Sequence, residues 1–416
     1  MADLSVELYG THVGDLVGTN PRAFDFRPSV TGRRSFGLGS TILSEAVPLE
    51  AVPNRGRVAR RRNFFTELLP EGDQRTYLAQ QAGLSEADTI GLLSHYGRDV
   101  AGAVQIWDPE NFGEPRTPFT TPVGDDEVAE MLRNSRKYPL GNIVESGKSL
   151  LNGVQTKIVL VRGDDAWLRP GDGFPSTHIL KPQLDDASSI IFDEEYGSRL
   201  ARLLGLADHA TSIERFDGLA TLVVQRYDRS PSSPDGRIHQ EDMNQALGAG
   251  GVEKYQKLGG KVSLQRIAQV LRSAGDSESL VRFARLNVLA VAVGNLDMHA
   301  KNVSLLHPFN EPRRLAPAYD MVPMAHLDND HEMALAVNGV YAHGAITADD
   351  LVTETDGWGI RDARALVVGA LEEIHALADR EAPLAQAWAG VQSDVMTFTA
   401  NLLAGAAVGS SSRFRP

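Results

Sequence analysis

Short stretches that alternate apolar and polar residues mark the first 110 or so residues of the chain. "LSVELYG" (4–10) and "DVAGAVQIW" (99–107) have the alternation that is typical of half-buried strands. Between them, "TYLAQQAGLSEADTIGLLSHYG" (76–97) predicts one helical hairpin. We therefore expect a small β-rich domain over residues 1–110. The polar, Pro-containing stretch that follows predicts a linker over residues 111–139.

Residues 140–229 alternate between strand-like and helix-like patterns. The stretches are, in order, "KIVLVRG", "THILKPQ", "IIFDEEYGSRLARLLGL" and "ATLVVQRYDR". The third has helical periodicity, and the other three are short apolar runs. This order of strand, strand, helix and strand predicts a small mixed α/β lobe.

Residues 230–405 have mostly helical periodicity. Four stretches place apolar residues every three or four positions, which predicts helices. They are residues 263–275, 279–295, 363–380 and 384–405. Ser263 is placed to cap the first helix, and the second is apolar on most faces and is expected to be buried. The fold class predicted for the whole chain is α+β, and residues 406–416 are expected to be a disordered tail.

Composition narrows the classes of protein to which the chain can belong. The 416 residues are enough for two or three domains, and the absence of cysteine excludes disulfides and thiolate metal sites. No apolar run reaches the roughly 18 residues that span a bilayer, and no secretory signal is evident. We expect a cytoplasmic protein without membrane contact. A formal charge of −13 argues against a surface that wraps nucleic acid.

One basic segment departs from this acidic balance. In "NRGRVARRRN" five arginines crowd together, at positions 55, 57, 60, 61 and 62. They form either a solvated surface segment or a contact point for nucleic acid or an acidic partner.

A dense polar cluster ends the apolar stretch 279–295. The segment "GNLDMHAKNVSLL" (294–306) contains Asn295, Asp297, His299, Lys301 and Asn302. Asp297 and Asn302 have the D-x-x-x-x-N spacing of the protein-kinase catalytic loop. A carboxylate can accept or orient the proton of a hydroxyl group, while a neutral amide oxygen binds Mg²⁺ without adding negative charge. A transition-metal site is an alternative for the D-x-H pair, but no further ligand cluster lies at metal spacing. A helix cap would explain only Asn295 or Asp297.

Other candidate residues lie at strand and helix ends. Asp320 follows two short strand-like stretches and is a candidate second magnesium ligand, although Met321-Val322 replaces the Phe-Gly of the kinase motif. Lys181 ends an apolar strand and could neutralise phosphate or simply face solvent. Glu194 begins the next helix, where it could pair with Lys181 as in protein kinases.

A glycine turn precedes these residues. Gly153 allows backbone N–H groups to approach an anion, with Lys157 nearby, or it is a plain hairpin glycine. Taken in order, Gly153, Lys181, Glu194, Asp297, Asn302 and Asp320 indicate a phosphoryl-transfer site.

These residues resemble one family, the HipA serine/threonine kinases, which are toxins of bacterial toxin–antitoxin modules. The matching pieces between residues 140 and 330 are "LNGVQTKIVL", "THILKPQ", "EEYGSRLARLLGL", "QRYDR", "HQEDMNQALG", "GNLDMHAKN" and "LAPAYDMV". "FFTELLPEG" and "YGRDVAGAV" are similar to the N-terminal domain of full-length members. The resemblance implies a kinase-like fold of two lobes, residues 140–229 and 230–405, preceded by the N-terminal domain.

The resemblance also assigns roles within an ATP and Mg²⁺ site. It implies that Asp297 is the catalytic base, that Asn302 and Asp320 hold magnesium, and that Lys181, paired with Glu194, contacts the ATP phosphates. The remaining implied nucleotide-binding residues are the phosphate-covering segment Asn152, Gly153, Val154, Gln155, Thr156 and Lys157, the hinge Gln225, Arg226 and Tyr227, and His299 and Lys301. The family hallmark "HQEDM" receives no chemical role. Many members autophosphorylate a serine three residues before the loop glycine. Here position 150 is Leu, and Ser149, four residues before Gly153, is the candidate.

The family resemblance further implies partners. Its kinases phosphorylate an aminoacyl-tRNA synthetase, glutamyl-type in the best-known case, so that growth stops. A small helix-turn-helix antitoxin, HipB-like, binds the toxin and the operator DNA in an autorepressor complex. Two other functions stay open: a small-molecule kinase on a related fold, and a non-catalytic DNA-bound co-repressor.

Overall fold

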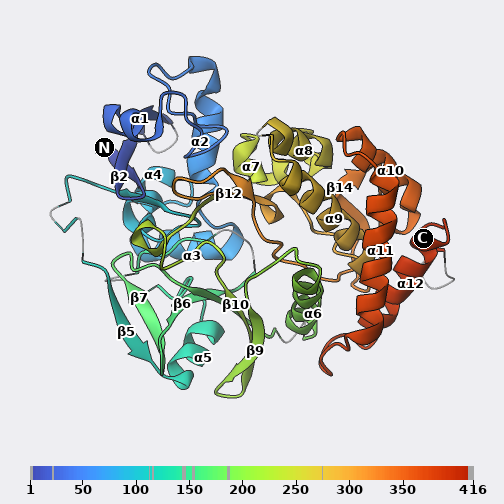
Figure 1. Cartoon of the computed structure of the whole chain (residues 1–416). Helices are drawn as coiled ribbons and strands as arrows, with labels where there is room; N and C mark the ends of the chain where they lie inside the picture. Colours follow the sequence, from blue (N-terminus) through green and yellow to red (C-terminus); the bar gives the residue numbers. More distant parts are fainter. Residues whose placement is uncertain are drawn as a thin grey trace.

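The N-terminal part of the chain forms a four-stranded antiparallel sheet with helices packed around it (Figure 1). The computed structural model describes residues 3–20, 23–111, 113–114, 117–142, 147–151, 155–184, 188–273 and 275–410. The strands, in the order β3-β2-β1-β4 across the sheet, are β1 (Leu4–Leu8), β2 (Thr11–Asn20), β3 (Ala23–Pro28) and β4 (Val104–Trp107). Leu4, Val6 and Leu8 are almost fully buried, so the alternation predicted for this strand is confirmed.

Helices make up more of this domain than the sequence pattern predicts. They are α1 (Val30–Phe36), α2 (Val58–Thr66), α3 (Gly72–Ala82) and α4 (Thr89–Tyr96). The predicted helical hairpin is confirmed as α3 and α4. The other two were not expected, because α1 is short and α2 contains a run of three arginines and has little apolar periodicity.

The arginine cluster is largely part of the protein's own packing. Arg61 is buried, and its Nε lies 2.7 Å from Asp25 of β3. The Nε of Arg62 donates to the carbonyl of Phe24 at 3.2 Å. Of the five clustered arginines, only Arg55 and Arg57 are exposed. Both interpretations of a five-arginine surface segment are therefore wrong for Arg61, because its charge is neutralised inside the domain.

A second antiparallel sheet forms the lobe that follows, with the order β5-β7-β6-β8-β10-β9. Its strands are β5 (Phe119–Val123), β6 (Ile158–Arg162), β7 (Trp167–Gly171), β8 (His178–Pro182), β9 (Thr211–Phe216) and β10 (Leu219–Gln225). Helices α5 (Asp125–Arg133) and α6 (Ile190–Leu203) pack against it. The predicted strands at residues 157–163, 177–183 and 220–229 and the predicted helix are confirmed, while β7 and β9 were missed.

The predicted linker over residues 111–139 is wrong for residues 119–133, which form a strand and a helix. Residues Phe119–Val123 pair with β7, and α5 packs on β8 and β9. Pro122 is tolerated there because β5 lies at the edge of the sheet, where a missing backbone N–H interrupts no second ladder. The mixed lobe therefore includes residues before position 140.

The third part of the chain is mainly helical. Its helices are α7 (Met243–Ala246), α8 (Leu264–Ser273), α9 (Ser277–Val293), α10 (Ala348–Gly357), α11 (Ala363–Arg380) and α12 (Val391–Leu403). Two small sheets consist of β11 (His239–Asp242), β12 (Ser304–His307) and β13 (Arg314–Leu315), and of β14 (Glu332–Val337) and β15 (Val340–Ala342). Short 3-10 helices are Arg55–Arg57, Pro234–Gly236, Gly251–Lys254, Gln256–Leu258, Ala300–Asn302 and His343–Ala345.

Helix α9 is the centre of this lobe. It contacts α6, α8, α11 and α12, as the apolar pattern on most of its faces predicts. Asp276 caps its start, and Gly294, with a φ of 68°, ends it in the left-handed region that favours glycine. The hydroxyl of Ser263 accepts the N–H of Arg266, which confirms the predicted cap of α8. None of the helices in the described ranges is long and apolar enough to cross a membrane.

Part of the expected tail is ordered. Val408 is buried, and its N–H donates to the carbonyl of Ile346 at 2.9 Å. The N–H of Gly409 donates to Gly344. The prediction of disorder is therefore wrong for residues 406–410, because an apolar side chain near the end docks on the helical lobe. Residues 411–416 lie outside the described residues.

The family hallmark "HQEDM" lies where the N-terminal domain meets the helical lobe. Tyr9 of the domain donates its hydroxyl to the carbonyl of His307 at 2.6 Å and accepts the N–H of His239 at 2.7 Å. Glu241 is completely buried and accepts the hydroxyl of Ser44 at 2.5 Å. His307 Nε2 lies 3.0 Å from the same carboxyl group. This stretch therefore fixes the domain onto β11 and β12.

The buried Glu241 makes the stability of this junction depend on pH. Burial raises the pKa of Glu241 to about 8 from its ordinary value near 4.5. Between these values the folded chain binds a proton that the unfolded chain releases, so the free energy of unfolding falls as the pH rises. Burial lowers the pKa of His307 to about 4, which has the opposite effect below pH 6.5. Burial also raises the pKa values of Glu194 and Asp242 to about 7, so between pH 6.5 and 8 the contribution of Glu241 is obtained as the difference between wild type and a variant at this position.

We predict that Glu241→Gln, which imitates the protonated carboxyl group, removes a stability loss of up to about 1.4 kcal/mol per pH unit in that range. Urea unfolding of both proteins at pH 6.5 and pH 8 measures the difference. Exposed Glu110→Gln serves as the control. Parallel pH dependences of wild type and Glu241→Gln would contradict the prediction.

Candidate active site

A cavity of about 440 Å³ lies where the six-stranded sheet, the helical lobe and the N-terminal domain meet. It brings together most of the predicted site residues. Those that line it are Gln155, Lys157, Lys181, Glu194, Gln225, Arg226, Tyr227, Asp297, His299, Lys301, Asn302 and Asp320. Thr156 is not among the lining residues. Asn152, Gly153 and Val154 lie outside the described residues, so their predicted contact with phosphates stays a prediction.

One buried ammonium group connects three elements at this cavity. Lys181 projects from β8, and its Nζ lies 2.8 Å from Oε1 and 3.0 Å from Oε2 of Glu194 on α6. The same ammonium donates to Asp320, which follows β13. The side chains of Lys181 and Glu194 are 8% and 2% exposed, whereas that of Asp320 is 39% exposed. Asp320 is therefore the member of the trio that a ligand in the cavity can reach.

The two carboxyl groups have different pKa values because they share one cation. Against the effect of burial, Lys181 lowers the pKa of Asp320 to about 2. Burial raises the pKa of Glu194 to about 7, although Lys181 attracts its charged form. Burial opposes the charge of Lys181, but Asp320 and Glu194 outweigh burial and raise the pKa of its ammonium. Lys181 and Asp320 are consequently charged at neutral pH.

The loop after α9 contains Asp297 and Asn302, which are hydrogen-bonded to each other. The side-chain Nδ2 of Asn302 donates to the backbone carbonyl of Asp297 at 2.8 Å and closes the loop. The hydroxyl of Tyr255 donates to Oδ1 of Asp297 at 3.2 Å. Asn295, at the start of the loop, donates to the backbone carbonyl of Asp320 at 3.1 Å. The loop and the segment that carries Asp320 thus line the same cavity and are connected by a hydrogen bond.

The electrostatic environment gives Asp297 a more basic carboxylate. Burial raises its pKa to about 6, against the attraction of Lys254 and the hydrogen bond from Tyr255. Burial lowers the pKa of the neighbouring His299 to about 3, so this imidazole is neutral. Burial, with Lys181 nearby, lowers the pKa of Lys157 to about 8. An ionised carboxylate, a neutral imidazole and ammonium groups therefore line one cavity.

The donor set fits Mg²⁺ better than a transition metal. Among the described residues, no group of three or more His, Cys, Asp or Glu side chains could hold a metal by itself. Asp320 offers a carboxylate, and Asn302 uses its amide nitrogen on Asp297, which leaves the amide oxygen for a cation. Mg²⁺ is usually bound through one or two protein oxygens together with substrate phosphates and water. The transition-metal alternative for Asp297 and His299 gains no third ligand here.

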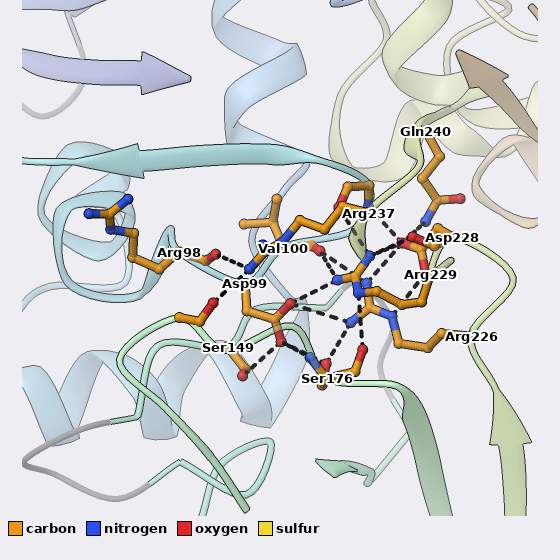
Figure 2. A network of polar contacts seen from close by, with 12 residues as sticks. Arg98, Asp99, Val100, Ser149, Ser176, Arg226, Asp228, Arg229, Arg237 and Gln240 are labelled. Atoms are coloured by element: carbon orange, nitrogen blue, oxygen red, sulfur yellow. Dashed lines mark hydrogen bonds and ion pairs between the residues drawn. The ribbon is translucent and has the colours of Figure 1, made fainter. Parts of the chain in front are cut away.

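The segment predicted to be the hinge, residues 225–227, is anchored through Arg226 in a buried network of arginines and aspartates (Figure 2). Arg226 Nη2 lies 2.8 Å from Asp228, and Arg229 Nη2 lies 2.7 Å from Asp99 of the N-terminal domain. Arg226 also donates to the hydroxyl of Ser176 at 2.8 Å. The guanidinium of Arg226 is thus occupied by hydrogen bonds within the network. A contact of this segment with adenine stays a prediction, and it concerns the backbone of residues 225–227 and the side chains of Gln225 and Tyr227.

Ser149 belongs to the same network. Its side chain is buried, and its hydroxyl donates to Asp99 at 3.1 Å (Figure 2). Autophosphorylation at this position, which stays a prediction, would require the segment around Ser149 to leave the network.

The cavity residues that the sequence did not predict include three charged or polar side chains close to Asp297 or Lys301. Tyr255 bonds to Asp297, and Lys254 precedes it. Glu71, from the N-terminal domain, lies 2.7 Å from the Nζ of Lys301 and 2.8 Å from that of Lys254. The stretch "LLPEG" was noticed only for its resemblance, and the segment around Lys254 has no recognisable motif. Contacts over such sequence separations leave no local pattern.

Comparison with known proteins agrees with this arrangement. Residues 4–107 match the HipA N-terminal domain, and residues 149–379 match the HipA-like C-terminal domain. A putative kinase, Y4mE of Sinorhizobium fredii, is 33% identical over 76% of this chain and 75% of its own length. The serine/threonine-protein kinase toxin HipA of Shewanella oneidensis is 27% identical over 76% of this chain and 75% of its own length.

A solved structure extends the likeness over nearly the whole fold. HipA of Shewanella oneidensis, solved with HipB and its operator DNA, has a TM-score of 0.77 and 24% identity, and the match covers 96% of both chains. The N-terminal domain and the kinase-like fold predicted from the sequence are therefore confirmed. The HipA-like C-terminal domain matches more than half of the residues of this chain, and the chain therefore belongs to the HipA family.

Proposed function

We propose that this protein is an ATP- and Mg²⁺-dependent serine/threonine protein kinase that acts as the toxin of a toxin–antitoxin module. The observation that carries the proposal is the convergence of Lys181, Asp297, Asn302 and Asp320 on one cavity, although 139 positions separate Lys181 and Asp320. Relatives named as kinases, one of them a serine/threonine-protein kinase toxin, support the same activity.

The side chains of the cavity divide the work of phosphoryl transfer. Lys181 and Lys157 present ammonium groups to the phosphates of ATP, and Glu194 keeps Lys181 in position. Asp297, ionised and 45% exposed, accepts or orients the proton of the acceptor hydroxyl. A Mg²⁺ ion held by Asn302 and Asp320 would neutralise the charge on the transferred group. Tyr255 and Asn302 keep the Asp297 loop closed.

Substrate and partners follow from the family. The proposed substrate is a serine or threonine of a protein, an aminoacyl-tRNA synthetase of the glutamyl type by resemblance, whose modification would arrest growth in the cytoplasm. The proposed partner is a HipB-like helix-turn-helix antitoxin that carries the complex to operator DNA, since the structurally similar HipA was solved with HipB and its operator DNA. Arg55 and Arg57 are the exposed arginines left for a direct DNA contact.

A carboxylate that can accept a proton is required at position 297. We predict that Asp297→Asn lowers kcat about 10²–10⁴-fold, because the amide keeps the shape and loses the basic oxygen. ATP binding stays within a factor of two of wild type. Transfer of label from γ-labelled ATP to proteins of a lysate, with identification of the modified residue, measures the effect.

The control for Asp297→Asn is Asp164→Asn, an exposed aspartate of the same lobe as β6. A wild-type rate for Asp297→Asn contradicts the assignment of the base. Turnover of a metabolite without any labelled protein favours the small-molecule kinase, and absence of magnesium-dependent ATP binding favours the non-catalytic co-repressor.

Asp320 should set the requirement for magnesium. We predict that a chelator abolishes transfer and that Asp320→Asn raises the Mg²⁺ concentration for half-maximal activity at least about tenfold, because a charged ligand becomes neutral. Titration of activity with MgCl₂ at saturating ATP measures the shift. Asp328→Asn, an exposed aspartate on the same segment, serves as the control. Equal magnesium titrations for Asp320→Asn and wild type would refute the assigned ligand.

A further inference from the structure

The N-terminal domain reaches into the cavity through one acidic side chain. Glu71 lies in the turn between α2 and α3, where Gly72 has a φ of 57°. Glu71 occupies the residue before α3, but its carboxylate caps no N–H of that helix. It points instead to the helical lobe and lines the cavity together with Lys254, Lys301 and Asp297. A local role in the domain therefore does not account for this carboxylate.

The first partner of Glu71 is Lys301, which lies inside the loop between Asp297 and Asn302. Its Nζ is 2.7 Å from Glu71 and 2.6 Å from Glu67, the residue that follows α2. The side chain of Lys301 is only 5% exposed. At its other end, the backbone carbonyl of Lys301 accepts the hydroxyl of Tyr319 at 2.7 Å. The residue that precedes Asn302 is thus held at both ends, once by the N-terminal domain.

The second partner is Lys254, the residue before Tyr255. Its Nζ lies 2.8 Å from Glu71 and 5.3 Å from the ring centre of Tyr255. The hydroxyl of Tyr255 in turn bonds to Asp297. One carboxylate of the N-terminal domain therefore touches both segments that fix Asp297: its own loop, through Lys301, and the Tyr255 segment, through Lys254.

Two carboxylates and two ammonium groups form the ion pairs of this cluster, and the charges of Asp242 and Arg75 act on it from nearby. Glu67 and Glu71 face Lys254 and Lys301, two carboxylates against two ammonium groups. Glu67 also accepts the N–H of Gly251 at 2.7 Å, so it is bound to a neighbouring segment as well. Loss of the Glu71 charge leaves two poorly solvated ammonium groups with one carboxylate, and like charges at short range push their segments apart.

We propose that Glu71 is a positioning residue for phosphoryl transfer, so that the N-terminal domain completes the active site of the kinase lobes. This inference rests on the proposed function, because it concerns the same Asp297 and Asn302. Glu71 touches neither reacting group and acts by fixing the loop that carries both. A displacement of about 1 Å in such a loop is enough to lower turnover about 10²-fold.

The test compares Glu71→Gln and Glu71→Asp with wild type in the full-length protein. Two quantities are measured: hydrogen exchange of the amides of residues 295–303, and kcat and KM for ATP. For Glu71→Gln we expect faster exchange in this segment and a kcat reduced about 10²-fold, with the KM for ATP within about threefold of wild type. Glu71→Asp keeps the charge on a shorter side chain and restores part of the loss.

Asp25→Asn is the matched control. Asp25 pairs with Arg61 inside the N-terminal domain and does not line the cavity, so its loss disturbs the domain without removing a partner of Lys254 or Lys301. This variant should leave kcat and the exchange of residues 295–303 unchanged. If Asp25→Asn slows turnover as much as Glu71→Gln, general destabilisation explains both results and the positioning role is overturned.

The outcomes separate this inference from the proposed function. In an active wild type, a change in only one of the two quantities, or in neither, overturns the positioning role of Glu71. If the wild type transfers no phosphate to any protein but Glu71→Gln still speeds exchange of residues 295–303, the kinase proposal fails and the anchoring of the loop stands. If exchange is unchanged as well, both fail.

Discussion

The buried ammonium of Lys181 is the interaction on which the site depends. It joins β8, α6 and the segment that carries Asp320, which no local pattern brings together. Because the side chains of Lys181 and Glu194 are 8% and 2% exposed, removal of the ammonium group would leave the Glu194 carboxyl group buried without its partner, at a cost of about 3–5 kcal/mol for a typical buried pair. The lobes are therefore constrained to meet at the cavity where the proposed phosphoryl transfer would take place. Asp320 remains accessible, so a ligand can approach the Lys181 ammonium group from the Asp320 side without breaking the pair of Lys181 and Glu194.

The N-terminal domain is part of this constraint. It docks on β11 and β12 through Tyr9 and Glu241, it reaches the hinge through Asp99, and it reaches the cavity through Glu71. Each contact replaces water by a hydrogen bond or an opposite charge in a buried place, where an unsatisfied group is costly. Figure 1 shows the domain lying against both of the other parts, which is consistent with these three anchors. The kinase lobes and the domain are thus expected to respond to perturbation together.

Local periodicity was sufficient to predict the elements whose own residues determine them, such as β8, α6 and the buried α9. The spacing of Asp297 and Asn302 was equally visible, since the two residues lie five positions apart in one loop. The edge strand β5 was mistaken for a linker because it is short, contains Pro122 and pairs on one side only. Glu71 and Tyr255 were missed because their partners lie far away in the sequence. The position of Arg61 was predicted wrongly for the same reason, because a run of arginines does not show that Asp25 of β3 pairs with one of them.

The central proposal is that Asn302 and Asp320 bind one cation and that Lys181 contacts the phosphates of the same nucleotide. A crystal structure of the full-length protein with Mn²⁺ and a non-hydrolysable ATP analogue tests it through the anomalous signal of the metal. The account predicts a peak within about 2.0–2.4 Å of an oxygen of each of the two side chains, with the β- and γ-phosphates completing the coordination. A nucleotide bound elsewhere, or a metal that contacts neither Asn302 nor Asp320, would contradict it.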